Sequence, residues 1–159
     1  MMKCGIEQKR KVQKMTDHIS PEQRSWNMSQ IKGKDTKIEV QVRSWLFSRG
    51  FRFRKNDKRY PGKPDIVLPK YKTVIFINGC FWHRHEGCKY ATVPKTRVEY
   101  WEDKFNRNIK NDMLHKQQLE EMGWRVLTIW ECQLKKDIFI ETMQNIEQNI
   151  TLSQSSEQG

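Results

Sequence analysis

The feature of this sequence that most constrains its fold is a pair of apolar segments on either side of a long amphipathic stretch. Residues 73–77 (TVIFI) form the most continuous apolar run, which is typical of a central strand buried on both faces of a sheet. Residues 124–130 (WRVLTIW) predict a second buried strand, and residues 96–122 have the periodicity of a helix. We therefore expect a mixed α/β central sheet flanked by helices. The apolar stripe predicted for the long helix is Trp101, Phe105, Ile109 and Met113.

Shorter elements are expected around these segments. The pattern at residues 65–68 predicts a short strand, and the alternation at residues 51–54 predicts a half-buried strand. A turn is expected at residues 60–64, which contain two prolines and a glycine. Three further helices are predicted: residues 20–33 with Ser20 as the cap, 36–50, and 133–149.

The chain shows no internal repeat and no domain linker. Its 159 residues and 19.2 kDa suit one domain with its own hydrophobic core. We expect a flexible basic arm at residues 1–19, a single domain at residues 20–150, and a disordered polar tail at residues 151–159.

The composition is strongly basic, with 30 Lys and Arg against 19 Asp and Glu and a net charge of +11. Such a surplus attracts polyanions, of which nucleic acid is the first candidate and an anionic membrane the second. A basic protein without either partner is the alternative. No apolar run approaches the roughly 20 residues of a membrane helix, and residues 1–15 lack the apolar region of a secretory signal. We therefore expect a cytoplasmic protein.

Residues 80–88 (CFWHRHEGC) concentrate two thiols and two imidazoles in nine positions. In a reducing compartment this spacing indicates a metal site, and zinc in structural sites takes four sulfur or nitrogen ligands. Buried thiols with incidental histidines are the alternative. The loop geometry does not assign which histidine meets the metal; with His85 on zinc, His83 is either free as a base or a spare surface histidine. Cys4 in the basic arm is expected to bind nothing. The predicted zinc ligands are Cys80, His85, Cys88 and Cys132.

Several separate motifs, in this order along residues 22–135, resemble those of one enzyme family. They are residues 61–65 (PGKPD), 76–83 (FINGCFWH), 94–97 (PKTR), 100–101 (YW), 123–126 (GWRV) and 130–132 (WEC). The chain resembles the Vsr, or very-short-patch repair, endonucleases. The resemblance implies the fold of type II restriction enzymes with an added structural zinc. It also implies nicking of DNA beside a thymine mispaired with guanine, the product of 5-methylcytosine deamination.

The resemblance assigns roles to four acidic or basic side chains. Asp65 would bind the catalytic magnesium together with the backbone carbonyl of Ile77, and His83 would be the general base. Glu39 would lie near the waters of the metal, and Asp112 would be a further active-site carboxylate that orients His83. Without the resemblance, Asp65 is a turn-forming aspartate after proline, and Glu39 and Asp112 are solvated helix charges.

The resemblance also predicts contacts with DNA. Phe81, Trp82 and Trp101 would insert into the duplex beside the mismatch, where a step unstacks most cheaply, although Trp101 equally suits a hydrophobic core. This chain has Asn78 where the family has a histidine; asparagine can bond a phosphate but cannot carry a proton at neutral pH. The metal loop is also one residue longer, with Gly87 inserted, and glycine accommodates such a turn.

The implied partner is double-stranded DNA with a T:G mismatch, acted on by a monomer, with the repair protein MutL as a candidate partner and no membrane. Two other functions remain open. One is a restriction-type endonuclease that cuts unmodified duplex DNA, and the other is a non-catalytic, zinc-stabilised DNA-binding protein.

Overall fold

The computed structural model describes residues 20–23 and 35–155, with side chains up to residue 152. The chain divides into two compact units, Met1–Gly33 and Lys34–Gly159. In the first unit, residues 21–23 are helical and the backbone N–H of Gln23 donates to Ser20 Oγ at 3.1 Å. Ser20 thus caps a helix start as predicted. The rest of the helix expected at residues 20–33, and the arm at residues 1–19, lie outside the described residues.

The second unit is built on a four-stranded sheet in the order β1-β2-β3-β4. β1 to β3 are successive antiparallel neighbours, whereas β3 and β4 are parallel, with Thr73 opposite Arg125 and Asn78 opposite Trp130. The expected mixed sheet is therefore confirmed. The strands are β1 (Arg54–Lys55), β2 (Ile66–Leu68), β3 (Thr73–Asn78) and β4 (Arg125–Trp130).

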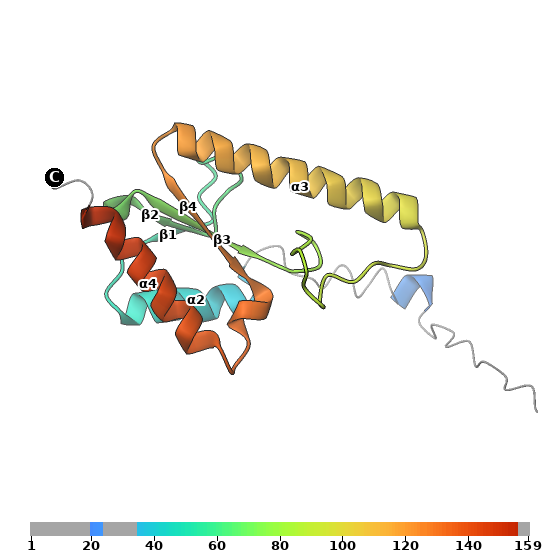
Figure 1. The fold of residues 1–159 in the computed structure, drawn as a ribbon, viewed down its shortest axis with the longest axis horizontal. Helices are drawn as coiled ribbons and strands as arrows, with labels where there is room; N and C mark the ends of the chain where they lie inside the picture. Colours follow the sequence, from blue (N-terminus) through green and yellow to red (C-terminus); the bar gives the residue numbers. More distant parts are fainter. Residues whose placement is uncertain (1–19, 24–34, 156–159) are drawn as a thin grey trace, which may run out of the picture. The chain divides into compact units, whose positions relative to one another are not determined.

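Helices cover both faces of this sheet (Figure 1). α3 (Val98–Glu121) connects the parallel pair and covers one face, while α2 (Lys37–Ser48) and α4 (Phe139–Ser155) cover the other. α2 begins as expected: the side chain of Thr36 caps it and accepts from the backbone N–H of Glu39.

β3 is buried on both faces, which confirms the interpretation of the run at residues 73–77. Ile75 and Ile77 belong to the core that β3 shares with α2 and α4. Val74 and Phe76, which alternate with them, pack on the α3 side. β4 is less buried than predicted: only Ile129 among its residues is fully buried, because β4 is an edge strand.

Two expected boundaries differ in the structure. Only Arg54 and Lys55 enter the ladder of β1, because Phe51 turns into the core before the strand begins. The last helix begins at Phe139 rather than residue 133, because a 3-10 turn, Glu131–Leu134, precedes it. It also continues through residues 151–155, which we expected in the tail, because buried Ile150 anchors its last turns.

The apolar stripe predicted for α3 is half wrong. Trp101 and Phe105 face the body of the protein, but Ile109 and Met113 are 38% and 69% exposed. The first turns of α3 extend past the sheet, beside the loop that follows β3 (Figure 1), and Trp101 and Phe105 pack there on Phe81. A stripe in steps of four residues advances by about 40° per step around a helix of 3.6 residues per turn, so Ile109 and Met113 turn away from the protein. The inward line is Trp101, Phe105, Asn108, Asp112, His115 and Leu119.

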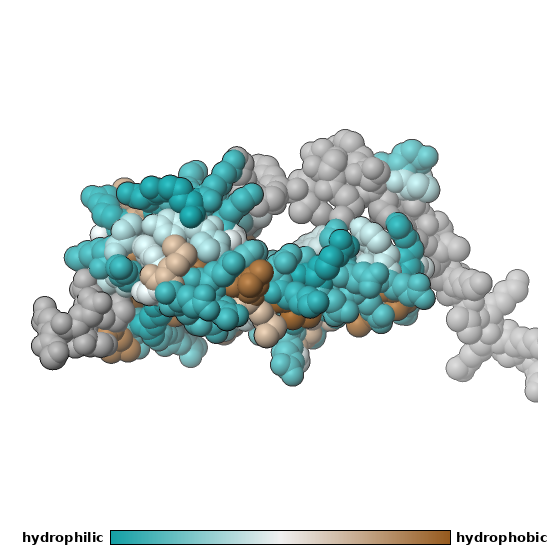
Figure 2. Space-filling model, turned by 90° about the horizontal axis from the view of Figure 1, so that it is seen from above, coloured by the Kyte–Doolittle hydropathy of each residue, from teal (hydrophilic) through white to brown (hydrophobic). Residues whose placement is uncertain are grey.

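The surface seen from the α3 side is largely hydrophilic, with apolar side chains in small, separate patches (Figure 2). Among the described residues, no helix combines the length and the apolarity that crossing a membrane requires.

Candidate active site and metal centre

Asp65 lies where the turn at residues 60–64 enters β2. The turn packs closely on α3 at Gly62, where a Cβ atom would lie only 2.8 Å from His115 Nδ1. Gly62 also has φ +74°, a conformation that other residues rarely adopt. The carboxylate of Asp65 accepts a hydrogen bond from the backbone N–H of Ile77 at 2.7 Å. Burial raises the pKa of Asp65 to about 6, with Glu39 adding to the rise and the Ile77 hydrogen bond opposing it. A buried carboxylate with a raised pKa suits a cation site.

The backbone of Ile77 contributes more than this N–H group. β3 continues beyond β2, whose first residue Ile66 pairs with Ile75. The N–H and C=O of one strand residue point to the same neighbouring strand. Because the Ile77 N–H points to Asp65, its carbonyl is directed to the same side. A carboxylate and a carbonyl oxygen are ligands that Mg²⁺ accepts, so the donor set fits this ion.

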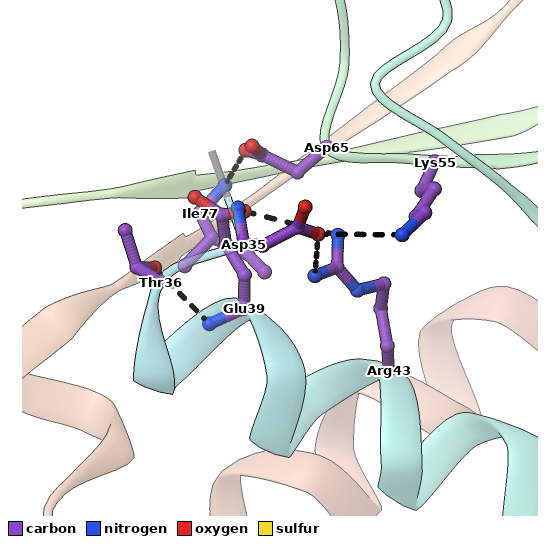
Figure 3. Close-up of polar contacts among 7 residues, drawn as sticks. All are labelled: Asp35, Thr36, Glu39, Arg43, Lys55, Asp65 and Ile77. Carbon is purple, nitrogen blue, oxygen red and sulfur yellow. Dashed lines mark hydrogen bonds and ion pairs between the residues drawn. The ribbon is translucent and has the colours of Figure 1, made fainter. Parts of the chain in front are cut away.

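Glu39 comes from α2, which lies below Asp65 in the view of Figure 3. It is only 5% exposed, and its Oε2 atom accepts from the backbone N–H of Asp35 at 2.8 Å. The interpretation of Glu39 as a solvated helix charge is therefore wrong. Burial of an ionised group is costly unless it is paired, and Arg43 Nη1 lies 3.8 Å from Glu39 Oε2.

His83 and Asp112 form a close pair between the loop after β3 and α3. The Nδ1 atom of His83 lies 2.6 Å from Asp112 Oδ2, and both side chains are about one-third exposed. Asp112 is thus a hydrogen-bond partner of His83 rather than a free helix charge. A carboxylate on Nδ1 makes this nitrogen the donor and leaves Nε2 as the acceptor, as a general base requires. The charge of His83 also acts on Asp65 and lowers its pKa, against the larger effect of burial.

The aromatic residues expected to touch DNA form one cluster at the start of α3. The ring of Phe81 lies 5.1 Å from that of Trp82 and 5.6 Å from that of Trp101. Trp101 also stacks on Phe105, so it is part of a small aromatic core while remaining partly exposed. Lys104 lies over Trp82 at 5.0 Å, which places positive charge on the cluster.

Two asparagines border the site. Asn78 ends β3 opposite Trp130 and is partly exposed. Asn108, which the sequence analysis did not select, donates from Nδ2 to the Trp82 carbonyl at 2.9 Å. This bond ties α3 to the residue that precedes His83.

The four predicted metal ligands converge. One ligand atom from each of Cys80, His85, Cys88 and Cys132 lies within 4.8 Å of all the others. His85 Nδ1 is 3.7 Å from Cys80 Sγ and 3.4 Å from Cys132 Sγ. Sulfur and nitrogen ligands on a tetrahedral zinc ion are about 3.5 Å apart, so the arrangement fits such a site.

The three cysteines of this cluster are free thiols, and the pKa values of Cys80 and Cys88 shift in opposite directions. Burial raises the pKa of Cys80 to about 12, whereas the backbone N–H of Tyr90 lowers the pKa of Cys88. His85 stacks on Trp130 with ring centroids 4.2 Å apart, which fixes the imidazole plane. A buried thiol with so high a pKa keeps its proton at neutral pH unless a bound metal ion replaces it. The cluster could therefore hold a metal ion.

Known proteins share this sequence over most of its length. A type II nicking enzyme of Neisseria meningitidis serogroup A, V.NmeAIP, is 50% identical over 121 residues, which cover 76% of this chain and 86% of that relative. The DNA mismatch endonuclease Vsr of Escherichia coli is 44% identical over 76% of this chain and 77% of its own. The family model described as DNA mismatch endonuclease Vsr matches residues 16–89. This chain belongs to the Vsr family. It is accordingly a DNA endonuclease.

The stretch matched by the family model, residues 16–89, includes Asp65, Glu39 and His83. Asp112 and Cys132 lie beyond it; Asp112 contacts His83, and Cys132 completes the cluster with Cys80, His85 and Cys88. Sequence reasoning missed Asp35 and Arg43, which surround Glu39. The available signal was Thr36-x-x-Glu39, the pattern of a capping box, followed by a basic residue four positions later.

Proposed function

We propose that this chain is a magnesium-dependent, strand-specific DNA nickase that cuts beside T:G mismatches and carries a structural zinc ion. The single observation that supports the proposal is that Glu39 and His83 both act electrostatically on Asp65 at the end of β3, while Asp112 contacts His83. Asp65 comes from the turn before β2, Glu39 from α2, His83 from the loop after β3, and Asp112 from α3.

The proposed chemistry divides between these residues. Asp65 and the Ile77 carbonyl would hold magnesium, whose positive charge would stabilise the phosphate as negative charge develops. His83 accepts the proton of the attacking water at Nε2, and Asp112 holds the imidazole through Nδ1 at 2.6 Å. In-line attack leaves a 5′-phosphate and a 3′-hydroxyl. Glu39 orients water at the site.

Mismatch specificity is proposed from the aromatic cluster and from the relative named a mismatch endonuclease. Phe81, Trp82 and Trp101 present rings beside positively charged Lys104. Inserting an aromatic ring into a duplex costs a few kcal/mol of stacking, and the cost is smallest at a mismatched step. A T:G pair would therefore be selected by its weaker stacking, with Asn78 bonding a nearby phosphate.

The zinc site would tie the loop that carries His83 to the end of β4, because Cys80 to Cys88 belong to the loop and Cys132 follows β4. This gives the catalytic loop a rigid support. The mixed sheet with helices on both faces agrees with the fold of type II restriction enzymes, which we propose for this domain. Monomeric action and a contact with MutL stay predictions.

The deciding experiment incubates the purified protein with matched and T:G-mismatched duplexes in several sequence contexts, with magnesium or with EDTA. We expect one strand of the mismatched duplexes to be nicked with magnesium only. Cutting of matched duplexes would favour the restriction-type alternative. Binding without cleavage under all conditions would favour a non-catalytic zinc-stabilised protein and overturn the proposal.

A further inference from the structure

Arg43 is a buried cation next to the candidate active site that the proposed chemistry does not use. It lies on α2 one turn after Glu39, and the two residues are 8% and 5% exposed. Its Nη2 atom is 2.6 Å from Asp35 Oδ1, and its Nη1 atom is 3.8 Å from Glu39 Oε2. Figure 3 shows the guanidinium of Arg43 and the ammonium group of Lys55 both reaching the carboxylate of Asp35.

Burying the charged groups of Arg43 and Glu39 costs free energy of folding in a helix that packs on a sheet. The neighbouring positions Val42 and Leu46 already provide the apolar contacts of α2 with the core. Burying charged groups costs several kcal/mol per ion before pairing offsets it, and well-packed apolar residues often serve stability equally well. Arg43 Nη1 is in addition buried without a hydrogen-bond partner among the described residues. Stability alone therefore accounts poorly for these buried charges.

The geometry gives Arg43 one specific effect, on Glu39. Asp35 accepts from Nη2 and so fixes the guanidinium plane, which turns Nη1 toward Glu39. Glu39 Oε2 is held from two sides, by the Asp35 N–H at 2.8 Å and by the charge of Arg43.

Charge points to the same conclusion. Figure 3 shows Glu39 and Asp65 at one site, and the buried cation Arg43 lies beside Glu39. Two buried like charges repel each other, and the repulsion would push Glu39 out of its position unless a cation opposed it. Arg43 is a cation that stays charged at all working pH values.

We propose that Arg43 is a positioning residue of the active site: clamped by Asp35, it holds the Glu39 carboxylate beside Asp65. The inference rests on the proposed nickase function, because Glu39 matters to the chemistry only there. Arg43 does not touch substrate, and its whole effect passes through Glu39.

A double-mutant cycle tests this dependence. Arg43→Gln and Glu39→Gln each remove one member of the pair, and the side-chain amide oxygen in Glu39→Gln can still accept from the Asp35 N–H. Misplacing a reactive group by about 1 Å costs on the order of 10²-fold, so each single variant should slow single-turnover nicking of a T:G duplex by roughly 10- to 100-fold. Because both act on one carboxylate, the double variant should be no slower than the slower single variant.

Arg49→Gln is the matched control. Arg49 lies just after α2 and pairs with Glu147 at 3.2 Å, away from Asp65. It should lower the melting temperature while nicking at the wild-type rate. Arg43→Lys keeps the charge without the planar fork that reaches both acids, and should recover most of the melting temperature but not the rate.

Crystal structures of Arg43→Gln and Arg49→Gln without DNA give a readout that needs no activity. We expect a displaced Glu39 carboxylate in the first and an unchanged one in the second. Multiplicative rate losses in the double variant, a folded Arg43→Gln protein that nicks at the wild-type rate, or an unmoved Glu39 would overturn the inference. If the wild-type protein nicks no duplex, the proposed function fails, while the position of Glu39 still decides whether Arg43 holds it.

Discussion

The imidazole of His83 and the carboxylate of Asp112 meet at 2.6 Å although they belong to a loop and to the middle of α3. Asp112 lies on the inward line of α3, between Asn108, which bonds the Trp82 carbonyl, and His115, which contacts the turn at Gly62. One helix face thus holds the catalytic loop and the turn before Asp65 at the same time.

His83→Ala should slow single-turnover nicking by on the order of 10² to 10⁴, the usual loss when a general base is removed. Zinc content should stay at the wild-type level, because His85 rather than His83 lies in the thiol cluster. Asp112→Asn should also be slower, but no slower than His83→Ala, since it acts through the imidazole. Loss of zinc from the His83→Ala protein would show that His83 is a metal ligand instead.

Asp65→Ala should abolish nicking and leave binding to a T:G duplex largely intact, because this carboxylate acts mainly on the chemical step. Nicking rates and binding isotherms on the same duplex separate the two effects. Glu141→Gln, an exposed acidic residue on α4, is the control and should leave both unchanged. Nicking by Asp65→Ala at the wild-type rate would remove Asp65 from the active site.

Stability without divalent cations should depend on the charge of Asp65. Its folded pKa of about 6 exceeds the unfolded value of about 3.9, so the folded state binds the proton more tightly. The stabilising contribution is complete below pH 4 and is lost as the pH rises through 6, by about 2–3 kcal/mol at most. Asp65→Asn should therefore melt higher than wild type at pH 7.5 and equally at pH 4. A lower melting temperature of the variant at pH 7.5 would contradict the raised pKa.

Cys132→Ser should lower zinc content and melting temperature together, because the binding energy of a structural zinc site is folding energy. Chelation of the wild-type protein should have the same effect. Elemental analysis gives the metal content, and Cys4→Ser, outside the predicted ligand set, is the control. Native protein that contains no zinc would end this prediction.

Affinity for duplex DNA should fall steeply with salt, because the +11 net charge implies release of counterions from the phosphates. A series of binding isotherms between about 50 and 200 mM salt should show a loss of several-fold to 10³-fold, depending on how many phosphates are contacted. A flat series would exclude an electrostatic contribution.

Local pattern was enough to predict several parts of this protein. The unbroken apolar run at residues 73–77 predicted a strand buried on both faces, because nearly every side chain in it is apolar. The close spacing of Cys80, His85 and Cys88 predicted a metal cluster, because short Cys and His spacing has few other uses in a reducing compartment. The family followed from motifs in a fixed order.

Tertiary structure decided what depends on neighbours distant in sequence. Which face of α3 turns inward was decided by its packing: Asn108, Asp112 and His115 face the loop and the turn, whereas Ile109 and Met113 are exposed. Glu39 is buried rather than solvated because Asp35 and Arg43 enclose it beside β2. The sequence by itself determined which residues could be ligands, bases or core. Only the packing of α2 and α3 on opposite faces of one strand end brought Asp65, Glu39 and His83 together, because a side chain's neighbours depend on long-range packing.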